Sequence, residues 1–576
     1  MKVLRRYKKK ILLTGILFLG VVALLTMFFP DQAERTVMLI SYLLPRSPRL
    51  LPEQEHQRVM SACRMDMGDA IPALYLSGTH YEMGYQHGQL AKDLIHAFRD
   101  KAVNFVASHV EKEYGAPAWL APMIAPSLLV WESAGYRRTI PSGIYDEVKG
   151  IADGAGIHPL EVVAATAIWE IYMAHGCSEF VAANEMTPDG SMIHGFNDDQ
   201  PSSQHAFASA YLAMIFYAPV DGLPFCTQNT VGTVGLYGGM NTAGISVAWD
   251  NTHTKDRTLY GNTKLPAVPY VVTLRRLLEE SSTLDQAIQV VCSAMPRPLA
   301  DIIIIGSAHE KKAVALETAG STCATRPLEE GVVWSTNHFR SETLAPHDRQ
   351  GDWRTMDATT CASKFPRHVA YEQLFKKYAG EITPEVAAKI VRDPYPREAD
   401  GYLHPPGGRR TTICRATTNF TFIMQAGKGL IWASDGKFPA PQGDFLAFDL
   451  KARARRPELD IKAAGYRDAL GSARAFLEND LPSAEKALNA AIEKDGETAP
   501  LLMMRAVLAM RNSDAASAEK VIASISDRWP ETVFARMAGA WSEKKHAEMP
   551  AIPFPSAIAP LLYFEGNPQA PCVANK

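Results

Sequence analysis

The segment HGCSEFVAANEMTPDGSMIHGFNDD, residues 175–199, decides the fold expected of this chain. Two alternating runs within it, SEFVAANE and SMIHGFND, flank the turn TPDG. An Asp-Gly pair between two such runs is a strong β-hairpin signal. Because the hairpin begins directly after Cys177, the sequence predicts this cysteine at the end of a sheet strand.

The pair Gly176-Cys177 has a chemistry of its own if the bond between the two residues is cut. A cysteine at a new N-terminus carries an α-amine whose pKa lies near 7.7–8.0. That amine can take the thiol proton without a separate histidine. Gly176 gives the backbone the freedom that an N-to-S acyl shift requires. A free cysteine is otherwise most often inert and buried, so the context of Cys177 decides its role.

Outward from the hairpin, the chain alternates runs typical of strands with runs typical of helices. The helical pattern, with apolar residues three and four apart, is clear at 144–156, 158–175, 270–294 and 368–379. The strand-like runs are AYLAMIFYA (210–218), VGTVGLY (231–237), GISVAWD (244–250), DIIIIGS (301–307), KAVALE (312–317), GVVWST (331–336), FTFIM (420–424) and GLIWAS (429–434). Many strands with helices inserted between them predict an α+β layered fold.

Four segments in this order resemble the acyl-coenzyme A:isopenicillin N (6-aminopenicillanic acid) acyltransferase family, peptidase family C45, of the N-terminal-nucleophile hydrolase superfamily. They are GTHYEMGYQHGQL (78–90), GC-x-x-F…DG…G-x-N-x-D (176–199), GGMNTAGISV (238–247) and STNHF (335–339). The resemblance covers roughly residues 70–450. It implies a four-layer αββα fold and a chain that cleaves itself between Gly176 and Cys177.

The resemblance also implies roles for three residues. Cys177 is the expected nucleophile, and Asp199 is the acid expected to orient the freed α-amine and stabilise its charge. Asn337 is the expected oxyanion donor, a group whose loss typically costs about 10²–10³ in rate. Without the resemblance, Asp199 would be interpreted as a turn residue and Asn337 as a loop amide.

Two further positions have an open interpretation. Asn241 lies where related amidases place a substrate-facing loop, or it is a turn residue before Gly244. Arg415 is a candidate for a second family arginine, or a surface arginine on a strand. Relatives that hydrolyse bile salts or ceramides carry an arginine where this chain has Phe196, and this departure favours the acyltransferase branch.

The N-terminus predicts a membrane anchor. Six basic residues precede residues 11–29, which contain no charge. A helix of about 20 apolar residues can span a bilayer, and a basic flank stays in the cytoplasm. The alternative is a cleaved signal peptide, but the run is long for one and no small-residue cleavage site follows. The sequence therefore predicts a single-pass membrane protein with its catalytic domain on the periplasmic or extracellular side.

The C-terminal region repeats itself. SAEKALNAAI begins at Ser483 and SAEKVIASIS begins at Ser517, a separation of 34 residues. This is the period of the tetratricopeptide repeat, although a plain helical hairpin packed on the catalytic domain is an equal alternative. The predicted organisation is a basic tail and transmembrane anchor (1–30), a linker (31–70), a catalytic domain (71–455) and a helical tail (456–576).

Composition excludes several classes of protein. A formal net charge of -3 gives no reason to expect a nucleic-acid partner. The eight cysteines have no zinc-like or redox-like spacing, and no cofactor or metal is predicted. One or two disulfides are compatible with an exported chain.

The sequence thus predicts a self-cleaving hydrolase or acyltransferase that acts on the C–N bond of an acylated small molecule. One alternative is an inactive membrane-anchored scaffold that binds a protein partner through its helical tail. Another keeps the enzyme and changes the substrate to lipid esters or peptides.

Overall fold

The computed structural model describes the chain in several stretches. The described residues are 30–68, 70–172, 176–199, 209–256, 259, 268–294, 297–349, 364–393, 412–415, 418–437, 439–528 and 538–539.

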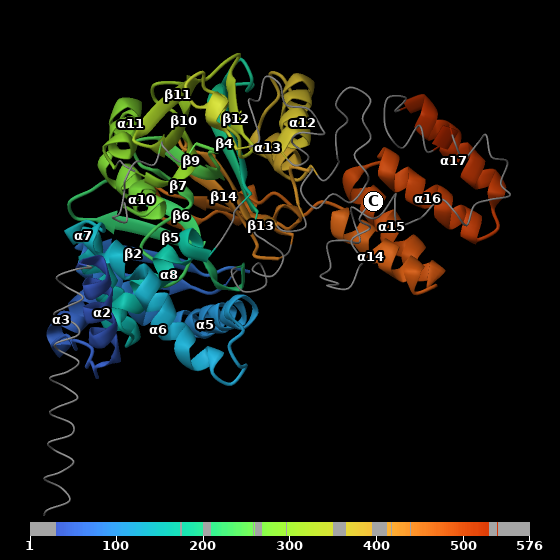
Figure 1. Cartoon of the computed structure of the whole chain (residues 1–576). Helices are drawn as coiled ribbons and strands as arrows, with labels where there is room; N and C mark the ends of the chain where they lie inside the picture. The colour runs from blue at the N-terminus through green and yellow to red at the C-terminus, as the bar shows by residue number, and fades with distance from the viewer. Residues whose placement is uncertain are drawn as a thin grey trace, which may run out of the picture.

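Two β-sheets stack at the centre of the molecule (Figure 1). The nine-stranded sheet has the order β1 (Arg64–Asp66), β2 (Ala73–Gly78), β5 (Leu212–Pro219), β6 (Phe225–Thr230), β7 (Gly238–Asn241), β8 (Ile245–Thr252), β9 (Arg297–Ser307), β10 (Lys312–Gly320) and β11 (Thr322–Pro327). The seven-stranded sheet has the order β12 (Val332–Ser335), β3 (Ser178–Asn184), β4 (Gly190–Asp199), β13 (Thr418–Gln425), β14 (Leu430–Ser434), β15 (Phe445–Asp449) and β16 (Ala454–Arg455). The β2–β5 pair is parallel, and the other described pairs are antiparallel.

The apolar run of β9 shows how the layers stack. Ile303 and Ile305 pack with α10 (Tyr270–Glu280) and α11 (Leu284–Ser293). Ile302 and Ile304 point the other way, against strands of the seven-stranded sheet. When both faces of a strand are covered, its sequence is a continuous apolar run, and residues 302–305 show this pattern.

The far face of the seven-stranded sheet is covered by α12 (Lys364–Lys377) and α13 (Pro384–Val391). Phe180 of β3 and Ile423 of β13 belong to the core between this sheet and the two helices. The layers therefore run helix, sheet, sheet, helix, in the αββα order expected of the catalytic core.

The predicted transmembrane helix and the single-pass membrane location are corrected here. Among the residues that the structure describes, no helix is long and apolar enough to cross a membrane. Residues 11–29, on which the prediction was placed, lie outside the described part of the chain. The first described helix, α2 (Pro30–Leu43), has 14 residues and a length of about 21 Å, against about 30 Å for the bilayer core.

The range predicted as a linker contains α2, α3 (Glu53–Ser61) and β1. Met38 of α2 is buried against Val130 and Leu160, so this helix packs on the domain. β1 pairs with β2 at the edge of the nine-stranded sheet. The segment before the domain is therefore folded onto it.

One predicted strand is wrong. Residues 231–237 form turns and irregular backbone between β6 and β7. Two of their backbone donors are satisfied by side chains from distant helices: Gly232 N–H donates to His87 Nε2 (3.0 Å) and Val234 N–H to Thr166 Oγ1 (3.2 Å). Burial lowers the pKa of His87 to about 4, which keeps the ring neutral and able to accept this bond.

A disulfide joins Cys292 at the end of α11 to Cys323 in β11. It ties the helical layer to the edge of the nine-stranded sheet. Among the described cysteines, Cys63, Cys177, Cys226 and Cys414 are free, and the last three of these are buried.

The segment GTHYEMGYQHGQL has a packing role. It forms the end of β2 and helix α4 (His80–Leu90), which crosses α7 (Ser142–Ala155) at very short range. A Cβ atom on Gly150 would clash with the carbonyl oxygen of Tyr81, and one on Gly84 would clash with that of Glu147. The glycines therefore allow two helix backbones to touch.

Replacing Gly150 by alanine is expected to destabilise the protein by about 1–3 kcal/mol, because the clashing atoms belong to a backbone that cannot move aside. The exposed helical Gly471 is the matched control, since an added Cβ would meet only Ala487 Cβ at 3.9 Å. Gly471→Ala should raise stability by about 0.5–1 kcal/mol. Denaturant midpoints followed by circular dichroism test both, and equal shifts would contradict the packing argument.

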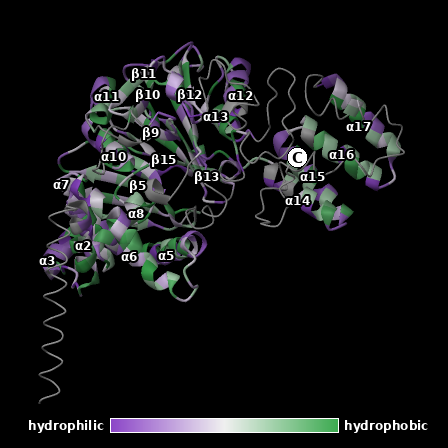
Figure 2. Ribbon diagram, viewed as in Figure 1, coloured by the Kyte–Doolittle hydropathy of each residue, from purple (hydrophilic) through white to green (hydrophobic). Residues whose placement is uncertain are grey.

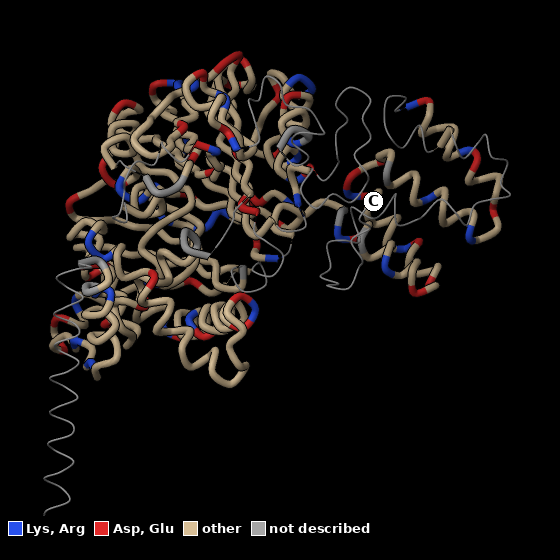
Figure 3. Tube along the Cα trace, viewed as in Figure 1, with Lys and Arg blue, Asp and Glu red and all other residues tan. Residues whose placement is uncertain are grey.

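The C-terminal region forms α14 (Tyr466–Leu477), α15 (Leu481–Asp495), α16 (Ala499–Arg511) and α17 (Ala515–Arg528), as Figure 1 shows. The 34-residue repeat is visible in the caps: Asp480 accepts from the N–H of Ser483 (3.2 Å), and Asp514 from that of Ser517 (3.0 Å). These helices share an apolar core of their own. Acidic and basic residues are interspersed along them and along the rest of the chain (Figure 3).

Candidate active site

Cys177 directly precedes β3 and is buried. In the β3–β4 hairpin Ser178 is opposite Asn197, so the same register places Cys177 opposite Asp198. Residues that are opposite each other on neighbouring strands share a face of the sheet. In agreement, Cys177 Sγ lies 3.7 Å from Asp198 Oδ1. The predicted hairpin is confirmed, and with it the place of the cysteine at a strand end.

Asp199 lies on the other side of the same strand end. The backbone of Gly176 donates to the carbonyl oxygen of Asp199 (3.0 Å). The Asp199 carboxylate accepts from Thr418 Oγ1 (2.6 Å) and pairs with Arg415 Nε (3.0 Å). The ion pair with Arg415 is made by the Oδ2 atom, and the bond from Thr418 is made to Oδ1. The structure thus brings three predicted residues, Gly176, Asp199 and Arg415, to the same place as Cys177.

Arg415 also lies directly against the Gly176–Cys177 bond. A Cβ on Gly176 would come within 2.5 Å of the Arg415 guanidinium. This arginine is 5% exposed, so it is a buried cation and not a surface residue of a strand.

Asn337 is held in a network that begins at Asp250. The Asp250 carboxylate accepts from Ser335 Oγ and from the backbone N–H of Asn337, both at 2.6 Å. The side-chain amide of Asn337 donates to Asp250 Oδ1 and to the carbonyl oxygen of Asn251 (2.7 Å). Asn337 has a φ of 70°, a left-handed conformation that asparagine tolerates better than most residues.

A second buried arginine connects Asn337 to the cysteine. Arg367 of α12 donates to the carbonyl oxygen of Cys177 (2.5 Å) and to Asn337 Oδ1 (2.7 Å). It fixes the orientation of the Asn337 amide, since the oxygen must face the guanidinium and the nitrogen must face Asp250.

Asn241 does not join this group. Its Nδ2 donates to the carbonyl oxygens of Leu278 and Ser281, and its Oδ1 accepts from the N–H groups of Ala243 and Ile245. Ile245 and Asp250 lie toward opposite ends of β8, about 16 Å apart at 3.3 Å per residue. The geometry favours the interpretation of Asn241 as a turn residue over that of a substrate-facing residue.

The charges around Cys177 are unusual for a protein interior. Burial raises the pKa of the Cys177 thiol well above its usual value, and Asp198, Asp250 and Asp199 raise it further. Glu179 lies close to Asp250, and burial followed by the charge of Asp250 raises the pKa of its carboxyl group well above the usual value. Counted by formal charge, the three aspartates and the two arginines Arg367 and Arg415 leave one negative charge in excess around a thiol that stays protonated.

Sequence reasoning missed Asp198, Asp250 and Arg367. Asp198 is adjacent to Asp199 in GFNDD, so the alternation of strand residues could have identified it. Asp250 ends the run GISVAWD and carries no further signal. Arg367 lies in a helix, and nothing local distinguishes it from a surface arginine.

A known protein family matches the part of the chain that contains most of these residues. Residues 192–401 match the model of the family "Acyl-coenzyme A:6-aminopenicillanic acid acyl-transferase". The predicted family resemblance is confirmed for this segment. The acyl-transferase segment contains Asp199, Asp250, Asn337 and Arg367, whereas Cys177 and Arg415 lie outside the match.

The curated proteins that match this chain are distant relatives. An uncharacterized protein of Archaeoglobus fulgidus is 26% identical over 291 aligned residues, and the match covers 46% of this chain and 46% of that protein. Protein dcd1B of Dictyostelium discoideum is 22% identical over 271 aligned residues, and the match covers 44% of this chain and 51% of that protein. The chain thus spans about half the length of the curated relatives it matches.

Two solved structures are also similar in part. An N-acylethanolamine-hydrolyzing acid amidase ortholog of Caenorhabditis elegans is 15% identical, covering 44% of this chain and 93% of its own, with a TM-score of 0.31. A mutant conjugated bile acid hydrolase of Clostridium perfringens is 13% identical, covering 48% of this chain and 93% of its own, also with a TM-score of 0.31. At these low TM-scores the two structures support no conclusion about the fold or the activity of this chain.

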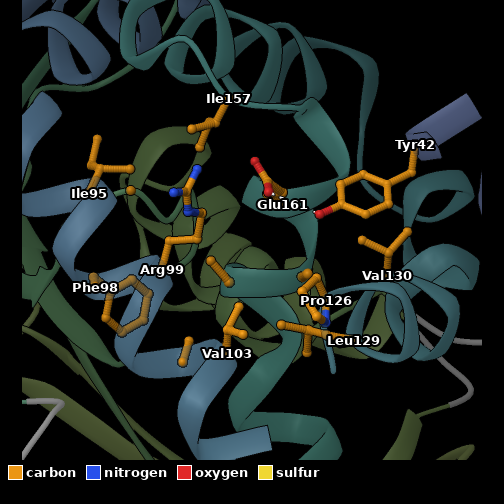
Figure 4. Close-up of a pocket in the computed structure, with 14 residues that line it drawn as sticks. Tyr42, Ile95, Phe98, Arg99, Val103, Pro126, Leu129, Val130, Ile157 and Glu161 are labelled. Carbon is orange, nitrogen blue, oxygen red and sulfur yellow. Dashed lines mark hydrogen bonds between the residues drawn. The ribbon is translucent and has the colours of Figure 1, made fainter. Parts of the chain in front are cut away.

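A separate pocket lies in the helical layer formed by α2, α5 (Lys92–Tyr114), α6 (Ala121–Ser133) and α8 (Pro159–Tyr172), as Figure 4 shows. Its lining is mostly apolar, in keeping with the hydrophobic stretches of α5 and α6 in Figure 2. Tyr42 OH donates to Glu161 (3.2 Å) within it. None of the residues around Cys177 lines this pocket.

The ionisation of Asp199 should be visible in the stability of the intact chain. Burial raises the pKa of Asp199 to about 6, against an opposing effect of Arg415 and Arg367. The folded state therefore keeps the proton to a higher pH than the unfolded state, whose aspartates titrate near 3.9. As pH rises from about 4 to about 6, this residue should lower the free energy of unfolding by about 3 kcal/mol, and the value should then stay constant.

Urea unfolding of a Cys177→Ala chain between pH 4 and 8 measures this effect without self-cleavage. The same chain with Asp199→Asn should lack the fall between pH 4 and 6. If both chains lose stability equally over that range, the raised pKa of Asp199 is contradicted.

Proposed function

We propose that the protein is a self-cleaving cysteine N-terminal-nucleophile hydrolase or acyltransferase that acts on the C–N bond of an acylated substrate. The observation that carries the proposal is the charge excess around Cys177. Cleavage of the Gly176–Cys177 bond would create an α-amine beside Asp199. The protonated form of this amine carries one positive charge. That charge would balance the one negative charge in excess among the surrounding ionised groups, which are Asp198, Asp199, Asp250, Arg367 and Arg415.

Asp199 is the residue that would hold the new amine. The Gly176 N–H already lies against its backbone, and its Oδ2 atom, which pairs with Arg415, has a second lone pair. An N–H of the amine can donate to that oxygen. Held in this way, the neutral amine takes the thiol proton of its own residue, and the thiolate becomes the nucleophile.

The acyl-transfer cycle follows from the same groups. The Cys177 thiolate attacks the substrate carbonyl carbon, and the oxyanion accepts hydrogen bonds from the Asn337 amide and a backbone N–H. In the intact chain this amide donates to Asp250 and Asn251, so an oxyanion has to replace one of these bonds. The ammonium returns its proton to the leaving amine, and water, an amine or a thiol then takes the acyl group from the thioester.

N-terminal sequencing of the purified protein tests the proposal directly. We expect a second N-terminus that begins with Cys177, and release of a chromogenic amine from acyl amides by the cleaved protein. The same acyl chains presented as esters separate amide from ester specificity. A chain that turns over substrate while the Gly176–Cys177 bond is intact would overturn the proposal, and an inert uncleaved chain would favour a binding role for the C-terminal helices.

A further inference from the structure

Self-cleavage poses a problem that the mature reaction does not have. While Gly176 and Cys177 are still joined, the nitrogen of Cys177 belongs to a peptide bond and cannot act as a base. The thiol that must attack the Gly176 carbonyl is buried and protonated. Some other group has to take its proton once, in the intact chain.

We propose that Asp198 is this base, an inference that rests on the proposed self-cleavage. Its Oδ1 atom is the hydrogen-bond partner of Cys177 Sγ, at 3.7 Å. Both side chains are fully buried, and the strand register places the two residues directly opposite each other. The contact is therefore fixed by the backbone of the hairpin and does not depend on a flexible loop.

The other carboxyl groups near the thiol are engaged elsewhere. Asp199 accepts from Thr418 and pairs with Arg415, and Asp250 accepts from Ser335 and from Asn337. Glu179 lies 3.7 Å from His194 Nε2, and burial raises the pKa of its carboxyl group well above the usual value. The adjacent aspartates thus divide two tasks: Asp198 serves the thiol before cleavage, and Asp199 holds the amine after it.

The step balances in atoms and charge. Asp198 takes the thiol proton as Sγ bonds to the Gly176 carbonyl carbon, and Arg367 and Arg415 stabilise the negative charge nearby. The C–N bond then breaks, and the Cys177 nitrogen receives the proton back from Asp198. A thioester between Gly176 and Sγ is left, and water hydrolyses it to the Gly176 carboxylate and the free thiol.

The rate of self-cleavage against pH distinguishes this role from a structural one. Full-length protein made by cell-free translation is followed from pH 6 to 9, with the buried Asp301→Asn as matched control. At pH 7 we expect Asp198→Asn to cleave about 10²–10⁴ times more slowly than the wild type, and Asp198→Glu to recover part of the rate. The Asp198→Asn chain depends on hydroxide, so its rate should rise about tenfold per pH unit while the wild-type rate stays nearly flat.

The Asp301→Asn control should cleave at the wild-type rate with the wild-type pH profile, because Asp301 accepts from Trp249 and does not contact the thiol. An Asp198→Asn variant that cleaves at the wild-type rate with the wild-type pH profile would overturn the role of Asp198 and leave the proposed function intact. A wild-type chain that stays whole at every pH would overturn both.

Discussion

Replacing Cys177 by alanine is expected to abolish self-cleavage and to lower turnover on the order of 10⁶-fold, as removal of a covalent nucleophile does in a well-studied protease. The reason is that one residue supplies both the attacking sulfur and, after cleavage, the amine that activates it. The other two buried free thiols of the described residues cannot replace the Cys177 thiol. Cys226 lies on β6 of the other sheet, and the Cys414 thiol contacts Gln442. Electrophoresis should show one full-length band, and the rate of amine release should fall to background.

Cys226→Ala is the matched control, because Cys226 is also free and fully buried and burial also raises the pKa of its thiol. This variant should cleave and turn over like the wild type. If both variants lose activity together, the effect belongs to folding and not to the nucleophile. If the Cys177→Ala chain retains turnover, the assignment of the reactive centre fails.

Replacing Arg275 by methionine should destabilise the protein by about 3–5 kcal/mol, the usual loss when one partner of a buried ion pair is removed. Arg275 is 1% exposed and pairs with Glu147 and Glu279, each at 3.0 Å. Its guanidinium also stacks over Tyr217 (4.1 Å) and Phe225 (4.2 Å). Burial already raises the pKa of Glu147 against the effect of this arginine, so methionine would leave a carboxyl group without its counter-charge.

The neighbouring Arg276 provides the control. It forms an equivalent pair with Glu280 at the helix surface (2.8 Å), and such exposed pairs contribute only about 0–1 kcal/mol. Denaturant midpoints of Arg275→Met and Arg276→Met should therefore differ widely. Adding Glu147→Met to Arg275→Met should recover part of the loss, and the absence of any recovery would contradict the ion-pair explanation.

The local patterns around Cys177 predicted more of the molecule than the overall composition did. The Asp-Gly turn predicted the β3–β4 hairpin, and most strand-like runs after it correspond to strands. The run 231–237 failed because its backbone donors bond to His87 and Thr166 from distant helices, which no local signal reveals. The membrane prediction was drawn from the uncharged run 11–29 and the basic residues before it, which lie outside the described part, and the described helices do not support it.

The sequence by itself determined the position of Cys177 at a strand end and its proximity to the strand end that carries Asp199, because a hairpin fixes its own register over a few residues. Only the tertiary structure decided which cations and amides surround that thiol. Arg367, Arg415, Asp250 and Asn337 arrive from separate elements far away in the chain, when the two sheets and the α12 layer pack together. The net charge that distinguishes a reactive cysteine from an inert buried one is the sum of the charges of these groups. Packing, and not the local sequence pattern, decides which groups lie close enough to the thiol to contribute.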